Sequence, residues 1–157
     1  MGTVIDLEEI KKFLDKANKH TYANKNAQKA KSTRLNSEDY HFEEGDLIYH
    51  DTYFGAKDFI GEEIIYKKGT PVWGANYFGF ILKEDVDKKV VYDFLRRALM
   101  QSHKSEIPVR GSSDFSFEDW AYQFSVNGHL GNFSGEEKIL FKGDVVYRCF
   151  VHGGFIK

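Results

Sequence analysis

Two segments of this chain carry nearly the same sequence: FIGEEIIYKKGTPVW at residues 59–73 and FSGEEKILFKGDVVY at residues 133–147. The shared residues keep one constant offset, so the two copies align without a gap. Self-similarity at a fixed spacing indicates a supersecondary unit that is built twice. We therefore expect two similar halves that pack around a pseudo-twofold axis.

An amphipathic helix is expected ahead of each copy. Asp6 and Glu9 have the spacing of a capping box at a helix N-terminus, and apolar residues then recur at helical intervals. The pattern Phe-Leu-x-x-Ala occurs at residues 13–17 and again at residues 94–98. The two halves are thus predicted to begin with equivalent helices.

Three strands are predicted after each helix. They cover residues 46–53, 62–67 and 71–78 in the first half, and residues 118–126, 137–141 and 145–151 in the second. Lys68-Gly69 and Lys142-Gly143 supply tight hairpin turns, because glycine accepts a positive φ without steric cost. The predicted fold is α+β: one domain over residues 1–157, with an antiparallel sheet built from two αβββ repeats (residues 5–81 and 85–156) and both helices on one face.

Two polar segments interrupt this pattern, at residues 20–44 and residues 102–116. The first is long for a connection inside a compact domain. It is either a mobile surface loop or a lid over a binding site. Both segments contain Arg-x-x-Ser, beginning at Arg34 and at Arg110, so the duplication extends into them.

Composition excludes several classes of function. The net charge of −2 gives no basic footprint for direct binding of nucleic acid. The single cysteine, Cys149, excludes an internal disulfide, and no segment resembles a signal peptide or a membrane span, so a cytoplasmic protein is expected. No phosphate loop or dinucleotide fingerprint indicates a cofactor, and no histidine pair has the spacing of a metal site.

Glu63 and Glu137 are the candidate charged residues of a ligand site. Because side chains alternate along a strand, each shares a face with the apolar residue two positions later, Ile65 or Ile139. We expect the two carboxylates at the rim of the core, close to each other, with raised pKa values that attract cations or hydrogen-bond donors. The alternative is a pair of ordinary carboxylates exposed to water.

Aromatic rings with polar tips are the candidate walls of a groove for a flat organic or cationic molecule. Tyr53, Trp73 and Tyr77 are selected because polar residues surround them in the sequence. The further candidate ligand-binding residues are Asn76, Arg110 as an anchor, and His152 at a sheet edge. The remaining rings fit ordinary core packing.

A set of short motifs extends over nearly the whole chain, from residue 7 to residue 156. They are Thr21-Tyr22-Ala23, Tyr49 with Asp51-Thr52-Tyr53, Phe59-x-Gly61-Glu62-Glu63, Trp73 with Asn76-Tyr77-x-Gly79, Phe94-Leu95 to Ala98-Leu99, Arg110-Gly111 and His152-Gly153-Gly154. Together they resemble a bacterial domain family of unknown function whose members often follow the helix-turn-helix of XRE-type transcription regulators. The resemblance implies a sensor domain. Because the first helix follows Met1 within a few residues, we expect a stand-alone domain without a DNA-binding module.

The duplicated unit is also similar, at the level of architecture, to GyrI-like effector-binding domains, which hold a ligand between two halves with a glutamate in the pocket. The expected partner is therefore a small organic molecule, cationic or aromatic, with no cofactor, metal or membrane involved. Two alternatives stay open. One is a hydrolase-like enzyme that uses the glutamate pair with His152 or Asp51, and the other is an interaction module that forms a homodimer or binds a partner regulator.

Overall fold

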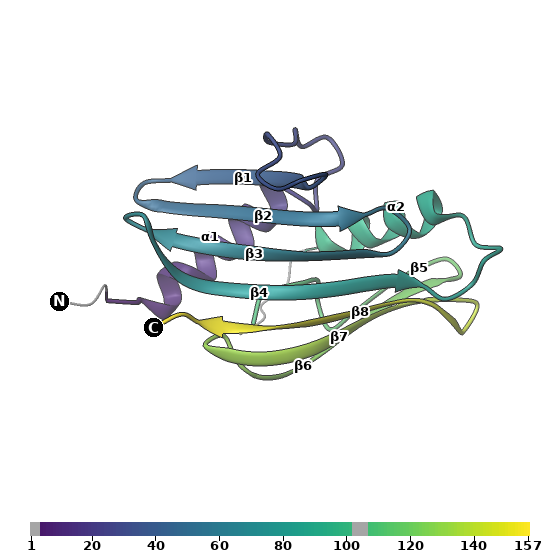
Figure 1. The fold of residues 1–157 in the computed structure, drawn as a ribbon. Coiled ribbons are helices and arrows are strands. Elements are labelled where there is room, and N and C mark those ends of the chain that lie inside the picture. Colours follow the sequence, from purple (N-terminus) through teal and green to yellow (C-terminus); the bar gives the residue numbers. More distant parts are fainter. Residues whose placement is uncertain (1–3, 102–106) are drawn as a thin grey trace.

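The computed structural model describes residues 4–101 and 107–157 and has one antiparallel sheet of eight strands with two helices (Figure 1). The elements are α1 (Leu7–His20), β1 (Glu38–Glu44), β2 (Leu47–Gly55), β3 (Phe59–Lys67), β4 (Thr70–Ile81), α2 (Lys88–Leu99), β5 (Asp114–Phe117), β6 (Trp120–His129), β7 (Asn132–Phe141) and β8 (Asp144–Phe155). The α+β fold and the antiparallel sheet are confirmed. His103 and residues 102–106 of the second polar segment lie outside the described residues.

The strands follow the order β1-β2-β3-β4-β8-β7-β6-β5 across the sheet. Each half of the chain supplies four neighbouring strands, and the halves meet where β4 pairs with β8. That central pairing is long, because it runs from Trp73 opposite Phe155 to Ile81 opposite Tyr147. The sheet is therefore continuous from one half to the other.

Each half contains one strand more than the three predicted. The extra strands, β1 and β5, form the two edges of the sheet and lie within the segments interpreted as loops. The sequence of β1, EDYHFEE, is strongly charged, and only Tyr40 in it is an apolar residue buried in the core. Charged side chains are typical of edge strands, where they oppose pairing with another chain. Because of these charges, the segment lacks the apolar alternation from which a strand is predicted.

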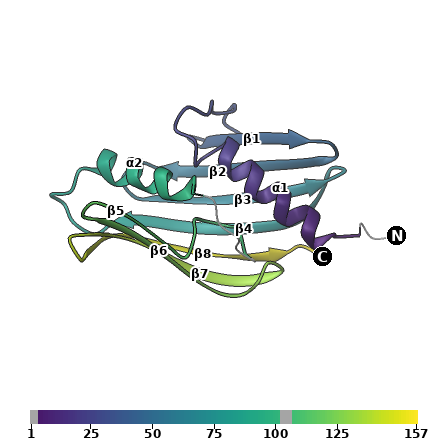
Figure 2. The same cartoon turned by 180° about the vertical axis from the view of Figure 1, so that it is seen from behind.

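Both helices lie on the same face of the sheet (Figure 2). Asp6 caps α1 by accepting hydrogen bonds from the backbone N–H groups of Glu8 and Glu9, at 3.0 and 3.3 Å. Asp87 caps α2 in the same way through Lys89 N–H, at 2.8 Å. Their buried stripes are Ile10, Phe13, Leu14 and Ala17 in α1, and Val91, Phe94, Leu95, Ala98 and Leu99 in α2. The helical spacing read from the sequence is thus confirmed.

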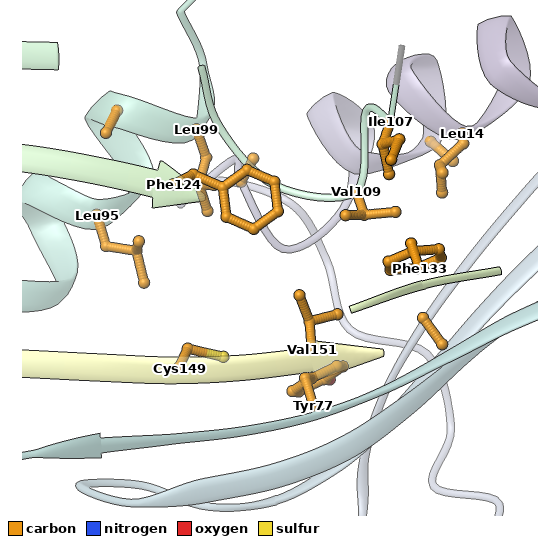
Figure 3. Close-up of a cluster of buried hydrophobic side chains, with 14 of the residues drawn as sticks. Leu14, Tyr77, Leu95, Leu99, Ile107, Val109, Phe124, Phe133, Cys149 and Val151 are labelled. Atoms are coloured by element: carbon orange, nitrogen blue, oxygen red, sulfur yellow. The ribbon is translucent and has the colours of Figure 1, made fainter. Parts of the chain in front are cut away.

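The core fills the space between the helices and the sheet, and a non-helical segment, residues 107–111, is part of it (Figure 3). All five residues of this segment are buried. Asn18 of α1 donates a side-chain hydrogen bond to the Pro108 carbonyl at 3.0 Å, and Tyr22 donates to the Val109 carbonyl at 3.0 Å. These bonds fix the backbone just before Arg110, and the Gly111 N–H donates to the Tyr122 hydroxyl at 2.9 Å just after it, so that the Arg110 side chain has a defined position.

No helix in the described part of the chain has the length and apolar character needed to cross a membrane.

The two repeated hairpin turns have the predicted geometry. Lys68 and Gly69 have φ of 50° and 79°, and Lys142 and Gly143 have φ of 50° and 84°. Two consecutive positive φ values define the type I′ turn, whose twist matches that of the flanking strands. An added Cβ at Gly143 would meet no atom within 4 Å, so backbone strain alone disfavours a side chain there.

Gly143→Ala is expected to lower the free energy of unfolding by about 1 kcal/mol, because a Cβ disfavours the left-handed region. Gly143→Asn should lose less, since asparagine tolerates that region better. Urea denaturation followed by circular dichroism measures both variants. An alanine variant as stable as the wild-type protein would contradict the assigned turn.

Candidate functional site

Three carboxyl groups lie on the core face of the sheet, beneath the helices. They belong to Asp51 on β2, Glu63 on β3 and Glu137 on β7, which are only 1, 2 and 0% exposed. Asp51 and Glu63 face each other as partners in the register of β2 and β3. The glutamates are therefore fully inside the core and not at its rim. Since a buried carboxylate is costly unless it is paired and hydrogen-bonded, their partners determine what the site can do.

Glu137 has a complete set of partners. Arg110 donates to both of its oxygens, from Nε and Nη2, each at 2.8 Å. The phenols of Tyr122 and Tyr147 donate as well, at 2.6 and 2.8 Å. Bidentate pairing with a guanidinium is among the stronger hydrogen-bonded interactions in proteins. Glu137 is thus a structural anchor for Arg110, and its oxygens are already occupied.

Glu63 and Asp51 are hydrogen-bonded by tyrosines in place of arginine. Tyr49 donates to Glu63 and Tyr77 donates to Asp51, both at 2.6 Å. Burial raises the pKa of Glu63 to about 7, although the Tyr49 hydrogen bond and the charge of Arg110 lower it. Burial and the neighbouring Glu63 likewise raise the pKa of Asp51 well above its usual value. The two carboxyls therefore tend to hold a proton near neutral pH.

The glycine of the repeated Gly-Glu-Glu motif makes room for one of these hydrogen bonds. A Cβ at Gly61 would overlap the phenol of Tyr77, whose ring crosses the glycine to reach Asp51. At Gly135, the corresponding glycine of the second copy, the ring of Phe124 occupies the same kind of space. The motif thus provides a gap in the sheet surface over which an aromatic side chain from a neighbouring strand can lie.

A cavity of about 290 Å³ opens between the β2–β4 strands and α2, next to Asp51. Asp51 and Arg110 supply its buried charged groups. Its aromatic walls are Tyr22, Tyr40, Tyr53, Phe59, Tyr77 and Tyr92. Lys29 also lines it, with its ammonium 3.2 Å from Glu38 and 5.5 Å from the ring centroid of Tyr53. The cavity therefore combines an aromatic wall, a buried acid and a solvent-facing ion pair.

Five of the eight residues selected from the sequence belong to this assembly. Tyr53, Tyr77 and Arg110 line the cavity. Glu63 lies beside the cavity residue Asp51 and is its register partner, and Glu137 holds Arg110 in place. Arg110 also links the two glutamates electrostatically, because it binds one and its charge lowers the pKa of the other.

The other three selected residues lie elsewhere. Trp73 is fully buried, donates to the Leu130 carbonyl at 2.9 Å and stacks on Phe133, so it belongs to the core. Asn76 and His152 are partners across β4 and β8 on the opposite, helix-free face, where they line a separate hollow. Neighbouring residues of a strand point to opposite faces, which separates Asn76 from Tyr77.

Sequence reasoning did not select three of the residues that surround the cavity, Tyr22, Tyr40 and Tyr92, and it named Asp51 only for the hydrolase alternative and not as a ligand-binding residue. Asp51 had a readable signal, since it alternates with Tyr49 and Tyr53 and therefore shares their face. Tyr22, Tyr40 and Tyr92 come from a loop after α1, an edge strand and a helix, and only the tertiary structure brings them together.

Other reactive groups stay outside this site. Cys149 is a buried free thiol, and burial raises its pKa to about 12, so it is a poor nucleophile. Within residues 4–101 and 107–157, no cluster of three or more histidine, cysteine, aspartate or glutamate side chains is arranged to hold a metal ion.

Comparison with known proteins gives a family and no activity. A family model described as a domain of unknown function (DUF5680) matches residues 51–156, about two thirds of the chain. This range contains Asp51, both buried glutamates and Arg110. No curated protein and no solved structure matches the chain.

Glu63→Gln is expected to remove a pH-dependent loss of stability. The folded protein raises the pKa of Glu63 from 4.5 to about 7, so its contribution to stability is complete below pH 4.5 and falls as the pH rises to about 7. The variant should match the wild type at pH 5 and exceed it at pH 8 by up to about 3 kcal/mol. Urea titrations across this range measure the difference. Glu62→Gln, on the exposed face, is the control, and an equal change in both variants would contradict the assignment.

Arg110→Ala is expected to lower the free energy of unfolding by about 3–5 kcal/mol, because it leaves Glu137 buried without its cation. Lys83→Ala removes a cation from a half-exposed ion pair with Asp144 and should cost less than about 1 kcal/mol. Chemical denaturation of the two variants at one pH provides the comparison. A loss at position 110 no larger than that at position 83 would mean that the buried pair contributes little.

Proposed function

Because the chain belongs to the DUF5680 family, whose description names no activity, we propose from the site alone that it is an effector-binding domain. The bound molecule is a small organic cation with an aromatic or planar body, held in the cavity beside Asp51. The single observation that carries this proposal is a buried acid pair, Asp51 and Glu63, at the edge of a cavity with aromatic walls.

The partners of the buried acids, and not the net charge of the cavity lining, support a cationic ligand, because Lys29 and Arg96 also line the cavity. Among the described residues, Arg110 is the basic side chain that is hydrogen-bonded to one of the three carboxyls of the core face, and both of its contacts go to Glu137. Asp51 and Glu63 are left with phenol donors and raised pKa values. A cation next to Asp51 would stabilise its ionised form and take the place of its proton.

The walls support a flat ligand of modest size. A cavity of about 290 Å³ lies at the lower end of the range for small-molecule sites, roughly 300–1,000 Å³. Tyr40 and Tyr53 stack with their centroids 6.3 Å apart, and Phe59 meets Tyr77 edge to face at 5.9 Å. Faces of such rings attract cations and stack on planar groups.

We also propose that the two halves derive from one duplicated unit, which is now used differently on each side. The element order supports this, because α1-β1-β2-β3-β4 is followed by α2-β5-β6-β7-β8. The hydrogen bond from Tyr49 to Glu63 has a counterpart from Tyr122 to Glu137 at matching positions of the repeat. The acid pair of the ligand site then belongs to the first half, and Arg110 and α2 of the second half complete the cavity.

Three probes of one shape and different charge test the proposal: benzamidine (cation), benzamide (neutral) and benzoate (anion). Benzamidine is expected to bind most tightly by calorimetry, and Asp51→Asn should weaken it at least tenfold, because a hydrogen bond to a charged group contributes about 1.5–3 kcal/mol. The benzamide affinity should change little in that variant. Asp85→Asn, at an exposed position, is the matched control. Tighter binding of benzoate than of benzamidine would contradict the proposal. An equal benzamidine affinity in Asp51→Asn and in the wild type would contradict it as well.

A further inference from the structure

A second group of interacting polar side chains lies at the β1 edge of the sheet, on the face without helices. His41 on β1 and His50 on β2 are direct partners in the register of these strands. Their Nδ1 atoms are 3.0 Å apart, and their side chains are 38% and 20% exposed. The sequence conceals this pair, because nine positions separate the two residues and only the hairpin brings them together.

The outer nitrogen of each ring faces a carboxylate. His50 Nε2 lies 2.6 Å from Asp39 Oδ2, and His41 Nε2 lies 2.7 Å from Glu43 Oε1. An ionised carboxylate only accepts hydrogen bonds, so each Nε2 carries a proton and donates it. In the neutral rings both Nδ1 atoms are then unprotonated, and their lone pairs point toward each other across 3.0 Å.

Hydrogen bonds from three hydroxyl groups fix the position of the Asp39 carboxylate. It is fully buried, and the hydroxyls of Ser37, Thr33 and Thr52 donate to it at 2.5, 2.6 and 2.8 Å. These three hydroxyl donors hold the carboxylate in place, and Asp39 Oδ2 lies 2.6 Å from His50 Nε2. This contact sets both the tautomer and the orientation of the His50 ring.

We propose that His41 and His50 bind a divalent transition-metal ion such as Zn²⁺ through their two Nδ1 atoms. Two nitrogens that bind one tetrahedral zinc at about 2.05 Å lie roughly 3.3 Å apart. From the observed 3.0 Å the rings must separate slightly and tilt until both lone pairs point at one ion. Metal-binding histidines characteristically donate their other N–H to a carboxylate or a carbonyl, and both rings here do so. Imidazole nitrogen is a good ligand for zinc, copper and nickel.

The site differs from a structural zinc site in its number of protein ligands. In the described part of the chain no third side chain of a ligating type completes the cluster, so water fills the remaining positions of the ion. Such an open site is weaker than a site with four protein ligands and accessible to exchange. It is also distinct from the cavity beside Asp51, because His50 and Asp51 are neighbours on β2 and point to opposite faces.

Calorimetric titration of the full-length protein, free of any histidine tag, with ZnCl₂ tests the proposal. One Zn²⁺ per chain is expected, and His41→Ala and His50→Ala should each weaken binding at least tenfold. Glu43→Gln should weaken it about tenfold, since loss of a carboxylate partner of a metal-bound histidine costs 10–100-fold in affinity. His20→Ala, whose Nδ1 contacts the Lys16 carbonyl, is the control and should bind as the wild type does.

A second measurement does not depend on the folding of any variant. In the wild-type protein, Zn²⁺ should shift the imidazole carbon-bound proton signals of His41 and His50 first among the histidines in an NMR titration. Unchanged signals would mean that a proton alone bridges the two nitrogens, and this outcome overturns the proposal. Equal zinc affinity in the wild type and in the doubly substituted His41→Ala/His50→Ala protein overturns it as well.

Discussion

The burial of carboxyl groups beneath two helices is the constraint on which the rest of this structure depends. A carboxylate in an apolar interior must be paired, hydrogen-bonded or protonated, because it loses the solvation that water provides. The fold uses all three responses. Glu137 is paired with Arg110, tyrosine hydroxyls donate to each of the three groups, and Glu63 has a pKa near 7. The buried segment at residues 107–111 brings Arg110 into the interior, where it pairs with Glu137.

The residues that surround the buried glutamate differ between the two halves. Asp51 faces Glu63 in the register, whereas Phe124 faces Glu137 at the matching place in the other half. Arg110 enters the core, but Arg34, its counterpart in the Arg-x-x-Ser pattern, lies exposed with its guanidinium 5.2 Å from the ring centroid of Phe54. One half is thus electrostatically complete without any ligand. The other half contributes two buried acids and most of the aromatic wall of the cavity, and this difference is the basis of the proposed ligand site.

Local sequence patterns predicted the helices, the I′ turns and the central strands, because each depends on a signal within a few residues. The edge strands were missed because β1 is charged and β5 has only four residues. In the candidate site, alternation correctly placed Glu63 and Glu137 on the apolar face, but it could not show how deeply the helices cover them. Trp73 and Asn76 were selected for their chemistry, and strand parity, applied to β4 as it was to β3, would have separated Asn76 from Tyr77. The set of rings from the loop after α1, from β1 and from α2 depends on tertiary packing, which no local pattern encodes.

The central pairing of β4 with β8 has a consequence for biosynthesis. The ribosome completes β4 long before it synthesises β8, which is the last strand of the chain. Until then β4, a strand of twelve residues, is an edge strand with unpaired backbone N–H and C=O groups. Such an edge can pair with strands of other nascent chains. The pairing of β4 with β8 joins residues far apart in the chain, and such long-range contacts slow folding. Loss of the whole of β8 would therefore leave β4 unpaired along this side and promote aggregation.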